Sequence, residues 1–304
     1  MTARAQLAVC PAFRVWILTF ISTAAIGQPQ ATPSSRMSAD VARIYQGALQ
    51  GNVPNASPTL APDLQSKARF DAQGRLQVKV NFDCKGEAPL GGLKTAGLVI
   101  TTTVKVPPMC VVEGHIRPSA LTALSAVSGV TAVDLPVYSV PHPPRRPLTL
   151  NQPNGVQGFT QGVANTAIDG SAVVLMHADQ FISNTTINGS GVTVGVMSGD
   201  ASHAAAIQAA GELPQNITLY ASSANPSPTD EGTVMLEEIH AVAPGAALAF
   251  CGPQSETEFV SCLQSLIAGG AHVVVDDIAY FDDVMSNQGA FAQAIHLSWR
   301  RIRR

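Results

Sequence analysis

A continuous apolar run constrains the fold of this chain more than any other feature. Residues 191–197 read Gly-Val-Thr-Val-Gly-Val-Met, a run rich in β-branched side chains and free of charge. Runs of this kind are typical of strands buried on both faces, as in parallel sheets with helices on each side. The carboxyl-terminal part of the chain is therefore predicted to be an α/β domain built on a parallel sheet.

Helical and extended patterns alternate around this strand. A short helical or irregular approach is expected at 173–181. We predict further strands at 217–221, 247–250 and 272–275, with helices at 204–210, 232–242 and 256–268 between them. Because the connections are short, right-handed crossovers and a parallel strand order are expected.

A different pattern precedes this domain. In residues 76–82, Leu-Gln-Val-Lys-Val-Asn-Phe, apolar and polar side chains alternate, which predicts a half-buried strand. We expect two more strands at 98–106 and 111–116, a helix at 118–127 with Pro118 in its first turn, and a returning strand at 130–135. Strands combined with a helix over this length predict a small α+β module.

Six prolines between 136 and 153 separate the two patterns, and so many prolines exclude a regular helix or central strand. The dibasic pair Arg145–Arg146 within this stretch is interpreted as solvated, with a processing site as the alternative. We accordingly divide the chain into a signal peptide at 1–27, a low-complexity leader at 28–66 with one helical candidate at 39–49, an α+β module at 67–140, a Pro-rich linker at 141–155 and the α/β domain at 156–304.

The first 27 residues indicate export. Arg4 and Arg14 precede the apolar run 15–21, and small residues at 25–27 suit a signal cleavage site. The run is short for a membrane-spanning helix, although an uncleaved anchor is the alternative. We expect a secreted or periplasmic protein with no membrane segment after signal removal.

Four cysteines remain in the mature chain, and an even count in an exported protein favours disulfides. Of the three connectivities, we prefer Cys84 with Cys110 and Cys251 with Cys262, because each pair lies within one predicted module. A zinc site lacks Cys-x-x-Cys spacing, and no cofactor is expected. The net charge of −3 argues against a nucleic-acid partner, and the arginines at 300–304 are read as a solvated end.

Acidic side chains follow the predicted strands and precede one helix. Asp200 follows the first buried strand, Asp230 and Glu231 stand where the helix at 232–242 begins, and Asp276–Asp277 end the last strand. The carboxyl ends of parallel strands are where polar sites form in such sheets. Calcium binding by Asp276–Asp277 with Asp282–Asp283 is an alternative without regular calcium-loop spacing.

Three motifs in this order resemble the subtilisin-like serine peptidases (subtilases) of the subtilisin/sedolisin superfamily: the strand at 189–197, the Glu231-Gly-Thr233 helix that ends at Ala243-Pro-Gly-Ala246, and the strand at 270–275. The resemblance implies a subtilisin-like parallel-sheet domain, endopeptidase cleavage of protein or peptide substrates, and an inhibitory propeptide at 67–140.

The resemblance also assigns roles to the acidic residues. Asp200 corresponds to the acid of the first strand, displaced two residues beyond Ser198, and Glu231 stands where the family has the histidine of its His-Gly-Thr triplet, next to Asp230. Asp200, Glu231 and Asp230 are therefore the candidate catalytic residues. His240 lies nine residues from Glu231, about 180° around the helix, so we expect it to cap or pack instead, and we expect Glu237 and Glu238 to be solvated.

The departures from the family concern its chemistry. The sequence holds neither a Gly-Thr-Ser motif nor the oxyanion-hole asparagine after the strand at 270–275, and residues 296–304 resemble neither a strand nor an amphipathic helix. We expect a truncated, inactive relative of a secreted peptidase. The alternative is a non-catalytic exported binding protein or propeptide-like inhibitor, and a nucleotide-binding Rossmann fold is excluded because no Gly-x-Gly-x-x-Gly turn follows the strand.

Overall fold

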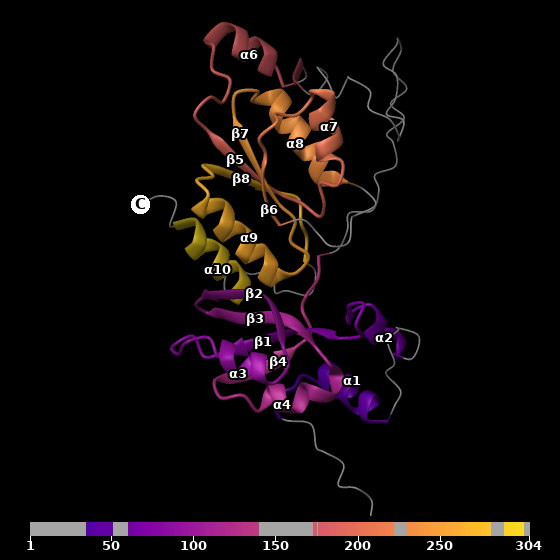
Figure 1. The fold of residues 1–304 in the computed structure, drawn as a ribbon. Helices are drawn as coiled ribbons and strands as arrows, with labels where there is room; N and C mark the ends of the chain where they lie inside the picture. The colour runs from indigo at the N-terminus through magenta and orange to yellow at the C-terminus, as the bar shows by residue number, and fades with distance from the viewer. Residues whose placement is uncertain are drawn as a thin grey trace, which may run out of the picture. The chain divides into compact units, whose positions relative to one another are not determined.

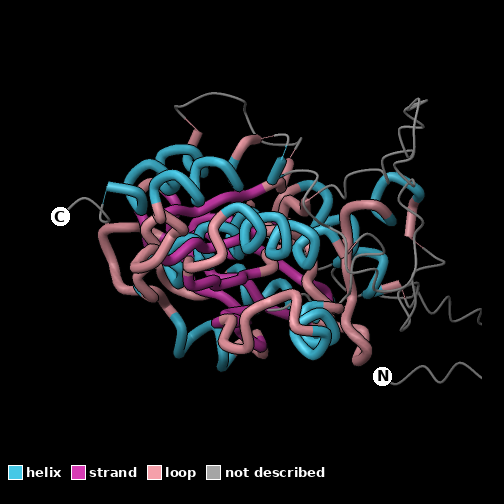
Figure 2. The backbone as a smooth tube through the Cα atoms, turned by 90° about the horizontal axis from the view of Figure 1, so that it is seen from above, coloured by secondary structure: helices cyan, strands magenta, loops and turns pink. Residues whose placement is uncertain are grey.

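The computed structural model describes residues 35–50, 60–139, 173–174, 176–221, 230–280 and 289–300. The predicted signal, the linker at 141–155 and Asp282–Asp283 lie outside these ranges. Within them the chain forms two four-stranded sheets, one antiparallel and one parallel, with helices packed on each (Figures 1 and 2).

The antiparallel module contains the first sheet, in the order β2-β3-β1-β4. Its strands are β1 (Leu76–Phe82), β2 (Val99–Val106), β3 (Met109–Ile116) and β4 (Val130–Asp134). Its helices are α1 (Ala39–Leu49), α2 (Pro62–Gln65), α3 (Leu90–Thr95), the short 3₁₀ turn η2 (Pro118–Ala120) and α4 (Leu121–Ser125).

The core of this module follows from the alternation in β1. Leu76, Val78, Val80 and Phe82 are all buried on one face of the sheet, as the period-2 pattern predicts. Helix α1 buries Val41, Ile44 and Tyr45 in the same hydrophobic cluster, so it packs as part of this module.

The parallel-sheet module contains the second sheet, in the order β6-β7-β5-β8 with every pairing parallel. Its strands are β5 (Thr193–Met197), β6 (Thr218–Ala221), β7 (Ala247–Cys251) and β8 (Val273–Asp276). Its helices are α6 (Ala178–Thr185), α7 (Ala204–Ala210), α8 (Glu231–Val242), α9 (Glu256–Ala268) and α10 (Ala290–Arg300).

Helices cover both faces of the parallel sheet, which explains the continuous apolar run in β5. Leu236 of α8 and Ala204 of α7 share a cluster with Val194 and Val196 on one face. On the other face, Leu266 of α9 joins a cluster with Met197, Ala249 and Phe259. The predicted strand and helix alternation is thus confirmed, and β5 lies second from one edge of the sheet.

Helix α10 corrects the interpretation of residues 296–300, which were expected to resemble neither a strand nor an amphipathic helix. The helix buries Ala294 and Ser298, and its partly buried Phe291 makes edge-on ring contacts with Phe259 and Tyr280, at centroid distances of 5.4 Å each. Phe291, Ala294, Ile295 and Ser298 thus recur at helical spacing and form the packed face of α10.

The two preferred disulfides are confirmed. Cys84 is bonded to Cys110 and Cys251 to Cys262, with Cα atoms 5.4 Å and 5.6 Å apart. Each bond lies within one module, so among the described residues the modules are held together by non-covalent contacts.

Those contacts come from the second face of the antiparallel sheet. Strand β3 is buried along nearly its whole length, because one face meets the module's own core and the other packs on α9 and α10 (Figure 1). The apolar cluster between the modules consists of Val104, Val106, Met109, Val111, Val260 and Ala294. In the described part of the chain, no helix has the length and apolar character needed to cross a membrane.

Candidate functional site

The carboxyl ends of β5 and β8 meet at one edge of the parallel sheet, as the sequence predicts. Ser198, directly after β5, is completely buried, and its Oγ donates a hydrogen bond to Asp277 Oδ2 at 3.3 Å. Burial raises the pKa of the neighbouring Asp276 above its ordinary value, with the charge of Asp277 acting in the same direction.

Asp200 lies between this edge and the start of α8. The residue is only 3% exposed, and its carbonyl oxygen accepts a hydrogen bond from the Gly232 N–H at 2.8 Å. One of its carboxyl oxygens, Oδ2, is buried without a hydrogen-bond partner. The structure thus brings the backbone of Asp200 against the Glu-Gly-Thr triplet, 31 residues away in the sequence.

Asp230 holds the start of α8 through its side chain. It is the residue before the helix, and its φ of 47° is unusual for a residue other than glycine. Its carboxyl group accepts hydrogen bonds from Thr233 Oγ1 at 2.9 Å and Ser202 Oγ at 3.1 Å, and it lies 2.8 Å from His203 Nδ1. Glu231, the first residue of the helix, is half-buried.

His203 is the functional candidate that sequence reasoning missed. When its Nδ1–H donates to Asp230, the ring is held in one orientation and Nε2 becomes the proton acceptor, as in general-base histidines. The side chain is 70% exposed, so Nε2 can meet a solute. The only signal for it in the sequence is the Ser-His pair that follows Asp200 in the loop after β5.

None of the described groups in contact with Asp230 and His203 is placed to act as a nucleophile toward His203 Nε2. Ser202 Oγ lies 3.3 Å from Nδ1, the nitrogen that already faces Asp230. A serine nucleophile must instead face the base nitrogen that is free to take its proton. Asp230 and His203 together can therefore orient a base, but Ser202 is not placed to use it.

Farther along α8, Glu237 lies in surroundings that differ from those expected, whereas His240 is partly buried near the helix end. Glu237 was expected to be solvated, and this is wrong: it is 7% exposed, and its Oε1 is buried without a hydrogen-bond partner. Burial raises its pKa to about 7, and the charges of Glu212, Asp230 and Glu238 act in the same direction. His240 is partly buried near the end of α8, with its Nδ1 buried and unpartnered.

No three His, Cys, Asp or Glu side chains within the described ranges are arranged to hold a metal ion. The calcium alternative involves Asp282–Asp283, which lie outside those ranges.

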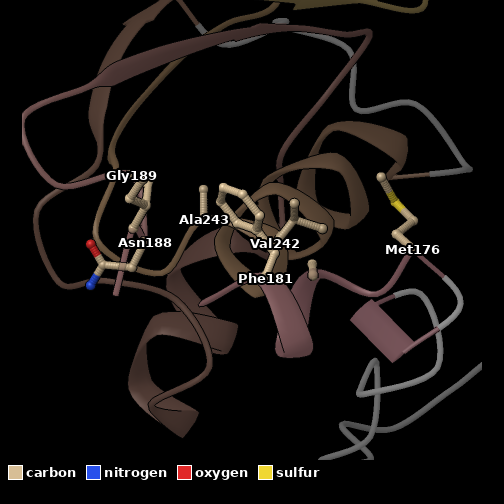
Figure 3. A pocket seen from close by; sticks show the side chains of 8 residues that line it. Met176, Phe181, Asn188, Gly189, Val242 and Ala243 are labelled. Carbon is tan, nitrogen blue, oxygen red and sulfur yellow. The ribbon is translucent and has the colours of Figure 1, made fainter. Parts of the chain in front are cut away.

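An apolar pocket of about 390 Å³ lies at the opposite end of β5. Figure 3 shows Phe181 beside Val242 and Ala243, with Asn188 and Gly189 close by. Since residues 188–189 precede β5 and 242–243 end α8, this pocket is separate from the acidic edge where those elements' other ends meet.

The structure defines a mixed α/β protein with one parallel and one antiparallel sheet. No protein-family model matches the chain, and no curated protein matches it. Similar solved structures include two of the epidermin leader peptide processing serine protease (EpiP) from Staphylococcus aureus, one of them a serine-to-alanine mutant.

The likeness to EpiP is distant. The mutant is 8% identical with a TM-score of 0.45, and the match covers 75% of this chain and 58% of that one. The other structure is 7% identical with a TM-score of 0.42, covering 75% and 57%. The chain therefore spans less than two thirds of the length of these proteases, and a likeness at this level carries no argument about activity.

Proposed function

We propose that this chain is an exported relative of the subtilisin-like serine endopeptidases, with the antiparallel module docked as a propeptide on the parallel-sheet module. The observation that carries the proposal is the meeting of Asp200 with the Glu-Gly-Thr triplet through the 2.8 Å bond between Gly232 N–H and the Asp200 carbonyl. The acid after the first strand and the triplet at a helix start are the two parts that the resemblance pairs.

The chain as printed is proposed not to cleave peptide bonds by covalent catalysis. Its 304 residues contain no Gly-Thr-Ser motif, and Glu231 stands in the place of the family histidine. His203, oriented by Asp230, supplies a base from the other side of the α8 start, but the neighbouring Ser202 faces the wrong nitrogen. Covalent catalysis requires a nucleophile within reach of the base, and Ser202 does not meet this requirement.

Hydrolysis of casein tests this part of the proposal. The purified chain without residues 1–27 is expected to release no more peptide than buffer does. The same sample with His203 replaced by alanine serves as a matched control. Casein cleavage that is abolished by a serine-directed inhibitor would contradict an inactive chain.

The second candidate is a non-catalytic inhibitor, in which the antiparallel module binds a separate peptidase. In this candidate the β2–β3 face, which packs on α9 and α10 within the chain, would be the surface that binds the peptidase. Titration of a subtilisin-type peptidase with the intact chain separates the two candidates. No inhibition is expected if the face is occupied within the chain, whereas stoichiometric inhibition would favour the inhibitor.

A further inference from the structure

A carboxyl group is buried in the contact between the two modules. Glu113 of β3 has no exposed surface. Its Oε2 accepts a hydrogen bond from Ser255 Oγ of the parallel-sheet module at 2.8 Å, and Gln77 Nε2 of β1 lies 3.5 Å away. The carboxyl group therefore belongs to one module while its shortest hydrogen bond comes from the other.

The groups around it come from the start of α9. Ser255 is the residue before this helix, and its hydroxyl accepts a bond from the Glu258 N–H at 3.2 Å while its proton goes to Glu113. The other carboxyl oxygen, Glu113 Oε1, and the Thr257 hydroxyl oxygen are both buried and make no hydrogen bond of standard geometry, although the Thr257 hydroxyl is near enough to lower the pKa of Glu113. A proton on Oε1 would let this oxygen donate a hydrogen bond, and the Thr257 hydroxyl can either accept or donate one.

The charged neighbours do not neutralise Glu113. Among the described residues, no cationic nitrogen lies within ion-pair distance of it, and the nearby Lys79 ammonium pairs with Glu256 at 3.8 Å. The Glu258 carboxylate also acts on this site and repels a second negative charge. A buried carboxylate without a cation is costly, so the carboxyl group tends to keep its proton.

An arginine and two tyrosines also lie at the contact between the modules. The Arg69 guanidinium lies over the Tyr138 ring, 3.7 Å from its centroid, and donates to Gln254. The Tyr138 hydroxyl donates to Gln77 Oε1 at 3.2 Å, and the Tyr280 hydroxyl donates to the Ser255 carbonyl at 3.0 Å. Burial raises the pKa of both tyrosines, so both stay neutral near pH 7. Two groups at this contact can change charge near neutrality: Glu113, and His115 of the same strand, whose pKa burial lowers below its ordinary value while the charge of Glu258 opposes that shift.

We propose that Glu113 is a proton-controlled latch between the two modules, which holds them together while its carboxyl group is protonated and weakens the contact when it ionises. The inference rests on the docked arrangement of the proposed function. Separation of the modules would expose Glu113 to water, where a carboxylate is well solvated, so ionisation favours the separated state.

The pH range follows from linkage. Burial raises the pKa of Glu113 from 4.5 to about 7 in the docked chain; the Thr257 and Ser255 hydroxyls and Lys79 oppose the shift, and Glu258 adds to it. The contribution of Glu113 to the affinity is therefore largest below pH 4.5, falls as the pH rises toward 7, and levels off above that value, while the lowered pKa of His115 acts in the opposite direction as the pH falls. For these two pKa values the dissociation constant rises on the order of 70-fold between pH 5 and pH 8.

A chain nicked between the modules measures this change. A specific protease site inserted between Asn154 and Gly155 allows the full chain to be cut after folding, and neither disulfide links the pieces. Dilution series analysed by size exclusion at pH 5 and pH 8 then give the dissociation constant of the two pieces. We expect the two pieces to stay bound to each other at pH 5 and to have a dissociation constant tens of times higher at pH 8.

Two variants identify the responsible group. Glu113→Gln mimics the protonated side chain, so the dissociation constant of its nicked form is expected not to rise between pH 5 and pH 8. Glu87→Gln, at an exposed carboxylate of the same module, is expected to keep the wild-type pH dependence.

The outcomes separate the latch from the docked arrangement. If the two pieces bind at pH 5 and have the same dissociation constant at pH 8, the latch is overturned but the docked arrangement is not. The wild-type measurements decide this even if Glu113→Gln fails to fold. A pH dependence that persists in Glu113→Gln also overturns it. Separation at pH 5 at micromolar concentration overturns both the latch and the docked arrangement.

Discussion

Replacement of Gly232 with alanine tests how closely α8 approaches the loop after β5. A Cβ atom at this position would collide with the carbonyl oxygen of Asp200 and lie 2.5 Å from Cε2 of the Phe250 ring. The Asp200 contact is with backbone, so it is relieved only if the helix start or the loop moves. The same movement would stretch the hydrogen bond from Gly232 N–H to the Asp200 carbonyl.

The magnitude follows from these contacts. An added methyl group in a well-packed site costs about 1–3 kcal/mol, and the loss of a buried backbone hydrogen bond adds about 1 kcal/mol. Alanine is favoured over glycine within helices, but position 232 lies in the first turn, where this gain is small. We expect a loss of about 2–3 kcal/mol, which lowers the urea midpoint by about 1 M at an m-value of about 2–3 kcal/mol/M.

Trp299 fluorescence provides the assay. Trp16 lies in the predicted signal, which leaves Trp299 on α10 as the one tryptophan of the mature sequence. The matched control is Gly91→Ala in the first turn of α3, where an added Cβ meets no atom within 4 Å and the midpoint is expected to stay unchanged or rise slightly. A Gly232→Ala midpoint equal to that of the wild type would refute the close approach of α8 to Asp200.

Three further predictions concern stability and the site. Asp230→Ala removes the acceptor that orients His203 and binds the Thr233 and Ser202 hydroxyls, so we expect a loss of about 1–2 kcal/mol in urea denaturation. In ¹⁵N spectra the His203 Nδ1 signal should then shift, because this nitrogen loses its contact with Asp230, and an unchanged ring signal would contradict the pair. Because the pKa of Glu237 is raised from 4.5 to about 7, the wild type should lose thermal stability as the pH rises from 4.5 to 7, and Glu237→Gln should lose less. Replacing Cys251 and Cys262 together by serine opens a loop with a separation of 11 residues and should cost about 3 kcal/mol by chain entropy, visible as a lower urea midpoint.

Much of the fold could be predicted because local pattern and tertiary packing agree. Helix α1 has the predicted bounds, since Val41, Ile44 and Tyr45 repeat at helical spacing and all three enter the core. Strand β5 was recognised because both of its faces meet helices, which leaves only apolar or small residues there.

The missed features depend on partners distant in the sequence. Strand β3 reads Met-Cys-Val-Val-Glu-Gly-His-Ile without alternation, because its second face is covered by α9 and α10. Glu113 within this strand gains its unusual surroundings only from Ser255, 142 residues away. No local period can reveal such a contact, since the strand's pattern is the same whichever element covers it.

The same limit applies to the candidate site. The predicted acids do lie where strand ends and a helix start converge, because this convergence follows from the parallel sheet itself. The partner of Asp230, in contrast, is His203, and their contact depends on how the loop after β5 folds back on α8. Sequence spacing of 27 residues gives no sign of this pair.

The Glu-Gly-Thr triplet shows why the motif is better evidence for packing than for catalysis. Gly232 is required because the Asp200 carbonyl leaves no room for a side chain, and the buried Thr233 hydroxyl binds the Asp230 carboxyl group at the helix start. Both residues would be retained by this packing in a protein without any hydrolytic activity. Under the proposed function, a catalytic role for this triplet would depend on its first residue, Glu231. A glutamate at that position can act as the base of a nucleophilic reaction only when a nucleophile lies within hydrogen-bond reach, so the chemistry of this edge depends on which group can reach Glu231 and His203.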